Sequence, residues 1–183
     1  MNVTEAVHSR RSIRQFLDKP VDRATLEQVL ETAQRSPSGD NTQPWNAIVV
    51  GGDALKEITA KIKDKAKAAP MGENMEYAIY PKDLDGRYEL FTYTRKYMGP
   101  PQWSDMGMWL QTVMLLLREA GLDSCPQEIW AMYGSYMREL LGIDDDHIFF
   151  CGMAIGHRDP DAPINKFDVP RVPIREAIEF RGL

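Results

Sequence analysis

The segment from Asp105 to Ala120 constrains the fold more than any other part of the sequence. Its apolar residues occupy every side of a helix and are Met106, Met108, Trp109, Leu110, Val113, Met114, Leu115, Leu116 and Leu117. A helix that is apolar all round is buried on every side. In a chain of 183 residues this burial is easier to complete if a second copy covers one face, which predicts a homodimer. A core helix within one chain explains the same pattern equally well.

Shorter patterns predict further helices and strands around this segment. Asp22 is a predicted N-cap for a helix that ends before Ser36-Pro37, and Asp53 for a helix that runs to about Lys67. A short helix is expected at 135–141, and irregular structure at 68–85. Apolar runs bounded by turn residues predict strands at Trp45 to Val50, Arg87 to Thr94, Leu122 to Glu128 and His147 to Ile155. Together these elements predict an α+β fold, a three-layer sandwich in which helices flank a mixed central sheet, as a single domain over residues 1–183.

The chain changes character after Gly156. Prolines interrupt the segment from His157 to Arg175 too regularly for a helix or a central strand, at positions 160, 163, 170 and 173. The segment is also too apolar in places to be a free tail. We therefore expect an extended C-terminal arm that lies across a surface of this chain or of a partner subunit.

Composition excludes several classes of protein. Lysine and arginine number 22 and aspartate and glutamate 27, which gives a formal net charge of −5, and no basic patch points to nucleic acid. Cys125 and Cys151 lie among apolar residues without metal-ligand spacing, which favours a reduced intracellular chain. The N-terminus does not resemble a signal peptide, because Arg10 and Arg11 follow its short apolar stretch. Since no apolar run reaches the roughly 20 residues that span a bilayer, we expect a cytoplasmic protein without a membrane segment.

Several catalytic constellations are absent from the sequence. The histidines His8, His147 and His157 share no ligand spacing with carboxylates or cysteines, so no metal site is expected. No phosphate loop, dinucleotide fingerprint or nucleophile elbow occurs. The run Asp144-Asp145-Asp146 lacks the alternating spacing of a calcium loop and is typical of a helix-to-strand turn.

Two polar motifs are candidates for ligand binding. Arg10-Arg11-Ser12-Ile13-Arg14 combines three guanidinium groups and a hydroxyl, which suits a phosphate and a second anionic group. A solvated basic turn is the alternative. The loop from Ser36 to Trp45 is rich in turn formers and amides, and amides can pair with the polar edge of a planar ring. A plain helix-to-strand connection is the alternative there, although such connections are usually shorter.

At this spacing, the two motifs resemble those of the nitroreductase family of flavin-dependent oxidoreductases. The resemblance continues in order through four later segments, Gly99–Asp105, Gly121–Glu128, Gly152–Gly156 and Arg171-Val172-Pro173, and so covers nearly the whole chain. It implies an FMN-bound homodimer with two active sites at the interface, each built from both subunits. It also implies that the C-terminal arm is exchanged between the subunits.

The resemblance assigns roles to particular residues. The cofactor-binding residues that it implies are Arg10, Arg11, Ser12, Arg14, Pro37, Ser38, Asn41, Pro126, Gln127, Glu128 and Arg171. Arg10 and Arg171 would grip the phosphate, and Arg14 would lie near the pyrimidine edge, where a cation stabilises the negative charge of reduced flavin. The residues at 37, 38 and 41 would come from the other subunit, whereas 126–128 would lie along the ring with a backbone N–H on N5. No residue needs to be an acid or a base, because the flavin does the chemistry.

The reaction that the resemblance implies is ping-pong. NADH or NADPH gives a hydride to flavin N5 and leaves, and an oxidised aromatic acceptor, a nitroaromatic compound or a quinone, takes its place. Two alternatives stay open. One is a family member with other flavin chemistry, such as dehydrogenation or dehalogenation, and the other is a flavin-binding module without turnover.

The middle of the chain departs from the pattern of the family. Between Tyr88 and Tyr97 it lacks a few dozen residues that family members usually carry beside the active site. The family's mid-chain lysine has no matching position, and Val169 stands where the arm usually has a second basic residue. These differences affect the acceptor pocket, the choice of nicotinamide and the affinity for FMN more than they affect the fold or the dimer.

Overall fold

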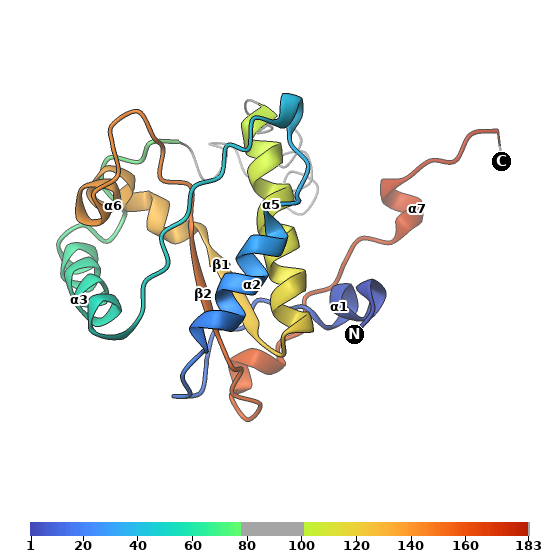
Figure 1. Ribbon diagram of the computed structural model, residues 1–183, viewed down its shortest axis with the longest axis horizontal. Helices are drawn as coiled ribbons and strands as arrows, with labels where there is room; N and C mark the ends of the chain where they lie inside the picture. Colours follow the sequence, from blue (N-terminus) through green and yellow to red (C-terminus); the bar gives the residue numbers. More distant parts are fainter. Residues whose placement is uncertain (78–100, 183) are drawn as a thin grey trace.

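The computed structural model describes residues 1–77 and 101–182 (Figure 1). Its helices are α1 (Val3–Ser9), α2 (Arg23–Ala33), α3 (Gly52–Ala68), α5 (Pro101–Glu119), α6 (Gly134–Leu141) and α7 (Ile174–Ala177). Its strands are β1 (Asp123–Gln127) and β2 (Gly152–Gly156), and 3-10 helices occupy η1 (Gly39–Asn41), η2 (Glu128–Tyr133) and η3 (Pro163–Lys166). No helix in the described part of the chain has the length and apolar character needed to cross a bilayer. The strand predicted at 87–94 and the second half of the irregular segment at 68–85 lie outside the described residues.

Helix α5 forms the centre of the main hydrophobic core, and α2 packs along it. The predicted N-cap of α2 is confirmed, because Oδ2 of Asp22 accepts a hydrogen bond from the Thr25 N–H at 2.9 Å. The buried residues of this core are Val29, Ala33, Trp45, Trp109, Val113, Leu117 and Leu122. Within one chain the burial of α5 is incomplete, since Met108 remains 37% exposed. The expectation that this helix is covered on all sides is therefore not met by a single subunit.

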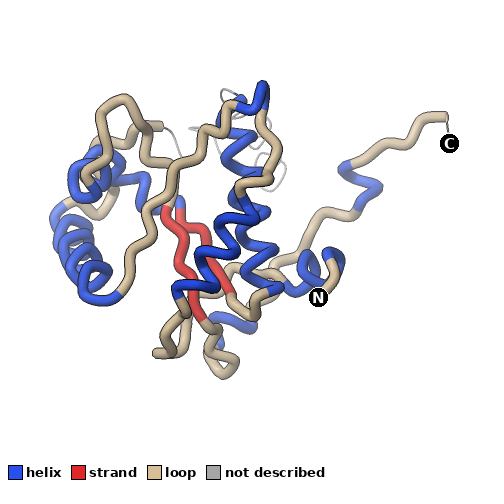
Figure 2. The backbone as a smooth tube through the Cα atoms, viewed as in Figure 1, coloured by secondary structure: helices blue, strands red, loops and turns tan. Residues whose placement is uncertain are grey.

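Strands β1 and β2 pair antiparallel beside α5, with Asp123 opposite Gly156 and Gln127 opposite Gly152 (Figure 2). The α+β class is confirmed, but the sheet in the described residues is smaller than the predicted mixed sheet. The run from Trp45 to Val50, predicted as a strand, pairs with no strand among residues 1–77 and 101–182, and Ile48 and Val49 are more than half exposed. The prediction there was wrong because β-branched residues favour an extended chain but do not supply a neighbouring strand. Of the strand predicted at 147–155, only the part from Gly152 onwards forms.

A second, smaller core lies between α3, η2 and α6 and is built on Ile62, Tyr133 and Met137. Helix α6 confirms the helix predicted at 135–141. Helix α3 begins earlier than predicted, because Gly51 and not Asp53 is its N-cap. Asp53 lies in the first turn, where its carboxylate pairs with Lys56 Nζ at 2.7 Å.

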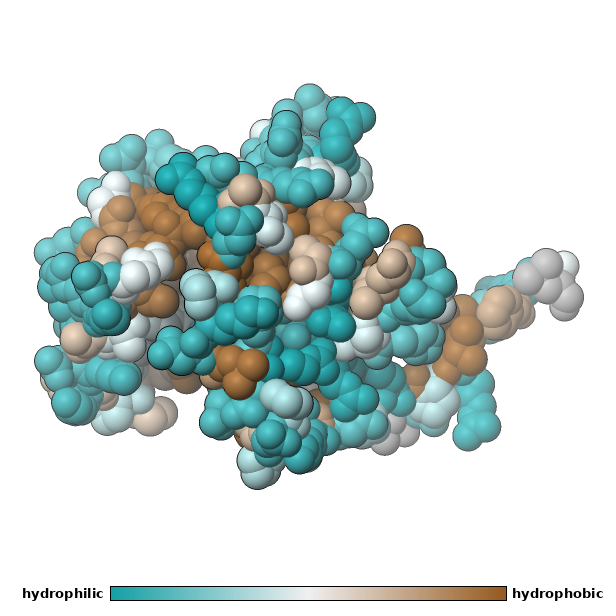
Figure 3. Space-filling model, turned by 60° about the horizontal axis from the view of Figure 1, so that its bottom comes forward, coloured by the Kyte–Doolittle hydropathy of each residue, from teal (hydrophilic) through white to brown (hydrophobic). Residues whose placement is uncertain are grey.

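The C-terminal arm leaves the body of the molecule, and Figure 1 shows α7 and the C-terminus projecting away from it. The arm is not extended throughout, because η3 and α7 interrupt it. Proline is compatible with the first turn of a helix, where its missing N–H has no acceptor to lose, and η3 begins at Pro163. Brown apolar surface is visible along the arm in Figure 3, in agreement with the exposure of Ile174, Ile178 and Phe180.

Candidate functional site

The segment from Arg10 to Arg14 lies against the edge of β1. Ser12 forms an isolated parallel bridge with Ser124, and the Ile13 N–H donates to the Ser124 carbonyl at 3.0 Å. The Ile13 side chain is fully buried, so it anchors the segment in the core. Because side chains alternate along an extended chain, Ser12 and Arg14 point away from the core on the opposite side. The structure thus brings the first polar motif next to the strand that leads into Pro126.

The guanidinium groups of Arg10, Arg14 and Arg171 have no ion-pair partner among the described residues. Arg14 Nη1 contacts only the Ser12 carbonyl, at 3.3 Å, and Arg171 Nη1 contacts the carbonyls of Val169 and Pro170. These contacts leave most of their N–H donors available, as binding an anion requires.

Arg11 differs from its neighbours because it pairs with Asp168 of the arm at 3.2 Å. Both side chains are substantially exposed, so the pair contributes little stability. The pair matters more for where the arm lies. Asp168 is three residues before Arg171, and an extended chain advances about 3.3 Å per residue, so the Arg171 backbone lies within about 10 Å of the Asp168 backbone. The pair thus connects the Arg10–Arg14 segment with the part of the arm that leads to Arg171.

The segment from Pro126 to Glu128 ends β1 and begins η2. Gln127 is fixed by its side chain, whose Oε1 accepts a hydrogen bond from Trp130 Nε1 at 3.0 Å. Glu128 is exposed, and its charge adds to the effect of burial on Cys151, which together raise the pKa of that thiol to about 12. The Cys151 thiol therefore stays protonated at neutral pH and is not a nucleophile.

The second polar motif lies at the other end of α5. The Gly39 N–H donates to the Asp105 carboxylate at 3.3 Å, and Ser38 Oγ accepts from the Gln43 N–H at 3.0 Å. Asp40 and Asn41 have φ angles of 48° and 55°, a left-handed conformation that short polar side chains tolerate. The structure therefore holds Pro37, Ser38 and Asn41 at the N-terminal part of α5.

One chain does not bring the two motifs together. The end of α1 contacts the C-terminal end of α5, where Arg118 Nε lies 3.4 Å from Ser9 Oγ. At 1.5 Å per residue, Arg118 lies about 20 Å along the helix from Asp105. Figure 1 shows the same separation, with η1 at one end of α5 and α1 near the other. Pro37, Ser38 and Asn41 are therefore remote from Arg10–Arg14 within a single subunit.

A buried ionic cluster beneath the Arg10–Arg14 segment was missed by the sequence analysis. Asp123 is 2% exposed and accepts hydrogen bonds from Arg118 Nη1 at 3.0 Å and from Arg158 Nε at 2.8 Å. The contact with Asp123 raises the pKa of Arg158. The available signal was the position of Asp123 near the start of the strand predicted at Leu122 to Glu128, because a buried carboxylate needs a cationic partner.

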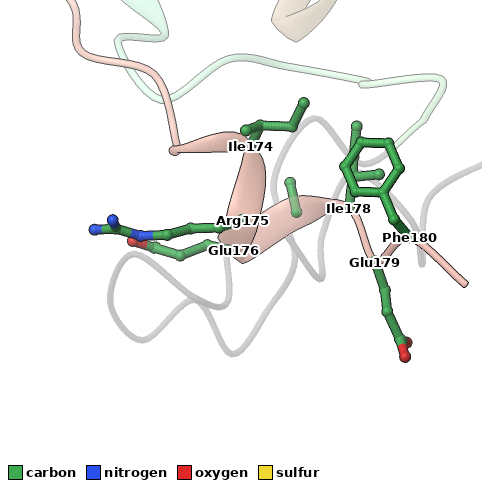
Figure 4. Close-up of a pocket in the computed structure, with 7 residues that line it drawn as sticks. Ile174, Arg175, Glu176, Ile178, Glu179 and Phe180 are labelled. Atoms are coloured by element: carbon green, nitrogen blue, oxygen red, sulfur yellow. The ribbon is translucent and has the colours of Figure 1, made fainter. Parts of the chain in front are cut away.

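The hollows of the surface do not coincide with the predicted residues. A hollow of about 420 Å³ is lined only by residues 174–180 of the arm, whose side chains are shown in Figure 4. A second, of about 380 Å³, includes Arg11, Arg158, Asn165 and Lys166. Only Arg11 belongs to the predicted set. Among the described residues, these two hollows therefore contain one of the predicted binding residues, Arg11.

The acidic turn between α6 and β2 brings three potential metal ligands together. Asp144, Asp146 and His147 offer ligand atoms within 4.8 Å of one another, and all three residues are exposed. His147 Nδ1 lies 2.7 Å from Asp146 Oδ1. Exposed acidic groups often occur together without a metal, so this turn gives no support to metal chemistry.

Comparison with known proteins adds a family to this geometry. The chloronitrobenzene nitroreductase of Comamonas testosteroni is 26% identical over 218 aligned positions, which include 97% of this chain and 96% of that protein. The 4-nitrobenzoate reductase of Pseudomonas putida is 28% identical over 96% of this chain and 94% of that protein. Both alignments are longer than the 183 residues of this chain, so these relatives carry residues that it lacks.

A solved structure agrees along the whole chain. The crystal structure of the FMN and NADPH-dependent nitroreductase NfnB from Sphigopyxis sp. strain HMH superimposes with a TM-score of 0.91 and 40% sequence identity, covering 100% of both chains. The model of the Nitroreductase family matches residues 7–157, from α1 to the end of β2. With both polar motifs and both strands inside that match, the chain belongs to the nitroreductase family.

Proposed function

We propose that this chain is an FMN-dependent NAD(P)H nitroreductase that reduces nitroaromatic compounds and quinones by a ping-pong reaction. The observation that carries the proposal is the set of guanidinium groups of Arg10, Arg14 and Arg171, which have no ion-pair partner among the described residues. Their donors suit a ligand with a phosphate and a second electron-rich region, and FMN has both. The proposal agrees with relatives that are named for the reduction of chloronitrobenzene, nitrobenzene and 4-nitrobenzoate.

The chain's own residues fit FMN in chemical type. Arg10 and Arg171 supply charged, forked donors for a phosphate, and the Arg11–Asp168 pair connects the arm that carries Arg171 with the segment that carries Arg10. Arg14 lies four residues after Arg10 in that segment, so it can contact the ring while Arg10 contacts the phosphate. Pro126 and Gln127 end the strand that Ser12 contacts and Glu128 follows it, so their backbone can lie along the ring near Arg14. Arg11 and Ser12 belong to the same segment and complete the set on this subunit.

The reaction then divides between cofactor and protein. When bound, FMN supplies hydride transfer between a nicotinamide and an acceptor. Arg14 stabilises the negative charge that grows near the pyrimidine edge, because a fixed cation needs no reorganisation during the reaction. Arg10 and Arg171 hold the phosphate, and a backbone N–H of 126–128 orients the ring. None of these groups has to exchange a proton.

We also propose a homodimer in which the chain acts as a single domain. The two motifs are about 20 Å apart along α5, so Pro37, Ser38 and Asn41 can complete a site only when a second subunit brings them to Arg10–Arg14. The incomplete burial of α5 and the apolar arm both provide surface for that subunit. The projecting α7 supports exchange of the arm between subunits (Figure 1).

The test is an absorbance spectrum of the purified protein, followed by anaerobic addition of NADH and then NADPH. We expect a flavin spectrum that is bleached by at least one nicotinamide and restored by 4-nitrobenzoate. A flavin spectrum that neither nicotinamide bleaches would favour other flavin chemistry or a binding module. A colourless protein that cannot be reconstituted with FMN would contradict the proposal altogether.

A further inference from the structure

We infer that Asn165, which lies in η3 at the root of the C-terminal arm, is a positioning residue for Arg14. The inference rests on the proposed function, because it takes Arg14 as the cation beside reduced flavin. Asn165 lies 151 positions after Arg14 in the sequence, yet its side chain contacts the Arg14 backbone directly. Neither of the two polar motifs nor the family match, which ends at residue 157, includes it.

The Asn165 amide makes four hydrogen bonds. Its Oδ1 accepts from the backbone N–H groups of Arg14 at 2.9 Å and Gln15 at 3.2 Å. Its Nδ2 donates to the backbone carbonyls of Gln15 at 2.7 Å and Asp159 at 2.9 Å. A primary amide has two N–H donors and an oxygen with two lone pairs, so this side chain uses its full capacity. A carboxylate in the same place would keep the acceptors and lose both donors.

These contacts fix the position of the Arg14 backbone, from which its side chain extends. The backbone around Arg14 is fastened to the 157–165 loop, since the Asp159 N–H donates to the Gln15 carbonyl at 3.1 Å and the Leu17 N–H to the His157 carbonyl at 2.9 Å. The Arg14 side chain itself is exposed and has one hydrogen bond, to the Ser12 carbonyl. Its direction therefore depends on its backbone, and Asn165 is the side chain that binds that backbone. Electrostatic stabilisation of a growing charge is sensitive to such placement.

The experiment is a double-mutant cycle on the midpoint potential of bound FMN. We expect Arg14→Ala to lower the potential by about 30 mV or more, which is a tenfold change in the equilibrium constant of a two-electron couple. Asn165→Ala should lower it in the same direction. The Arg14→Ala/Asn165→Ala double variant should lower it no further than Arg14→Ala alone, because one residue acts through the other.

Two further variants make the result decisive. Asn165→Gln keeps a neutral amide with both acceptor and donor atoms and should give a smaller shift than Asn165→Ala, and it replaces the alanine variant if that protein does not fold. Asn46→Ala alters an exposed amide outside the site and should leave the potential unchanged. If Arg14→Ala shifts the potential while both Asn165 variants do not, or if the double variant is additive, the inference is overturned and the proposed function stands. If Arg14→Ala itself has no effect, the proposed role of Arg14 is wrong and the inference falls with it.

Discussion

Asp123→Ala is expected to lower the free energy of unfolding by about 3–5 kcal/mol, because it leaves two guanidinium groups around an empty site. Asp123 is nearly fully buried and connects Arg118 of α5 with Arg158, which follows β2. Without the carboxylate, both cations lose their main partner, and the site cannot solvate them as water would. Denaturant unfolding of the purified protein, followed by tryptophan fluorescence, measures the difference.

The control for this prediction is an ion pair on the surface. Glu27→Ala removes a carboxylate that pairs with Arg23 at 2.7 Å, where both side chains are mostly exposed. A pair of this kind contributes little, so the loss of stability should be much smaller than for Asp123→Ala. Equal losses in the two variants would mean that the buried cluster contributes no more than a surface pair.

Arg10→Ala and Arg171→Ala are each expected to weaken FMN binding by at least about tenfold, because a hydrogen bond to a charged group contributes roughly 1.5–3 kcal/mol. The two losses together should make the purified protein nearly free of flavin. Fluorescence titration of the apoprotein with FMN measures each dissociation constant. The unfolding midpoints of the apoproteins should stay close to that of the parent, since neither side chain has an ion-pair partner to lose among the described residues.

Arg23→Ala is the matched control for the two phosphate residues. It also removes an exposed arginine and the same formal charge, but Arg23 lies at the start of α2, away from β1. We expect its FMN affinity to be unchanged. Full retention of FMN by the Arg10→Ala/Arg171→Ala variant would refute the assignment of these residues to the phosphate.

The elements that the sequence predicts well have their signals close together in the chain. Asp22 and the apolar positions that follow it define α2, and Gly121 lies just before the apolar Leu122 that leads into β1. The order of the polar motifs was sufficient to indicate the family. These features depend on neighbours within a few residues, so a single sequence contains them.

The features that were missed depend on contacts between distant parts of the chain. Trp45 to Val50 has the composition of a strand, but pairing requires another segment that local composition does not specify. Asp123 meets Arg158, which is 35 positions away, and Asn165 meets Arg14 across most of the chain. The sequence predicted an extended arm that lies across a surface of this chain or of a partner subunit, and the structure shows that η3 and α7 form within it.

Because the arm carries Arg171, the proposed function links two equilibria, the binding of FMN and the association of two subunits. If the arm both holds the phosphate and contacts a second chain, each of these binding events orders it. The event that comes second then costs less conformational entropy, because the first has already ordered the arm. Thermodynamic reciprocity then requires FMN to raise the affinity between subunits by the same factor as association raises the affinity for FMN. In the proposed dimer, FMN would in that sense also be a ligand that regulates assembly.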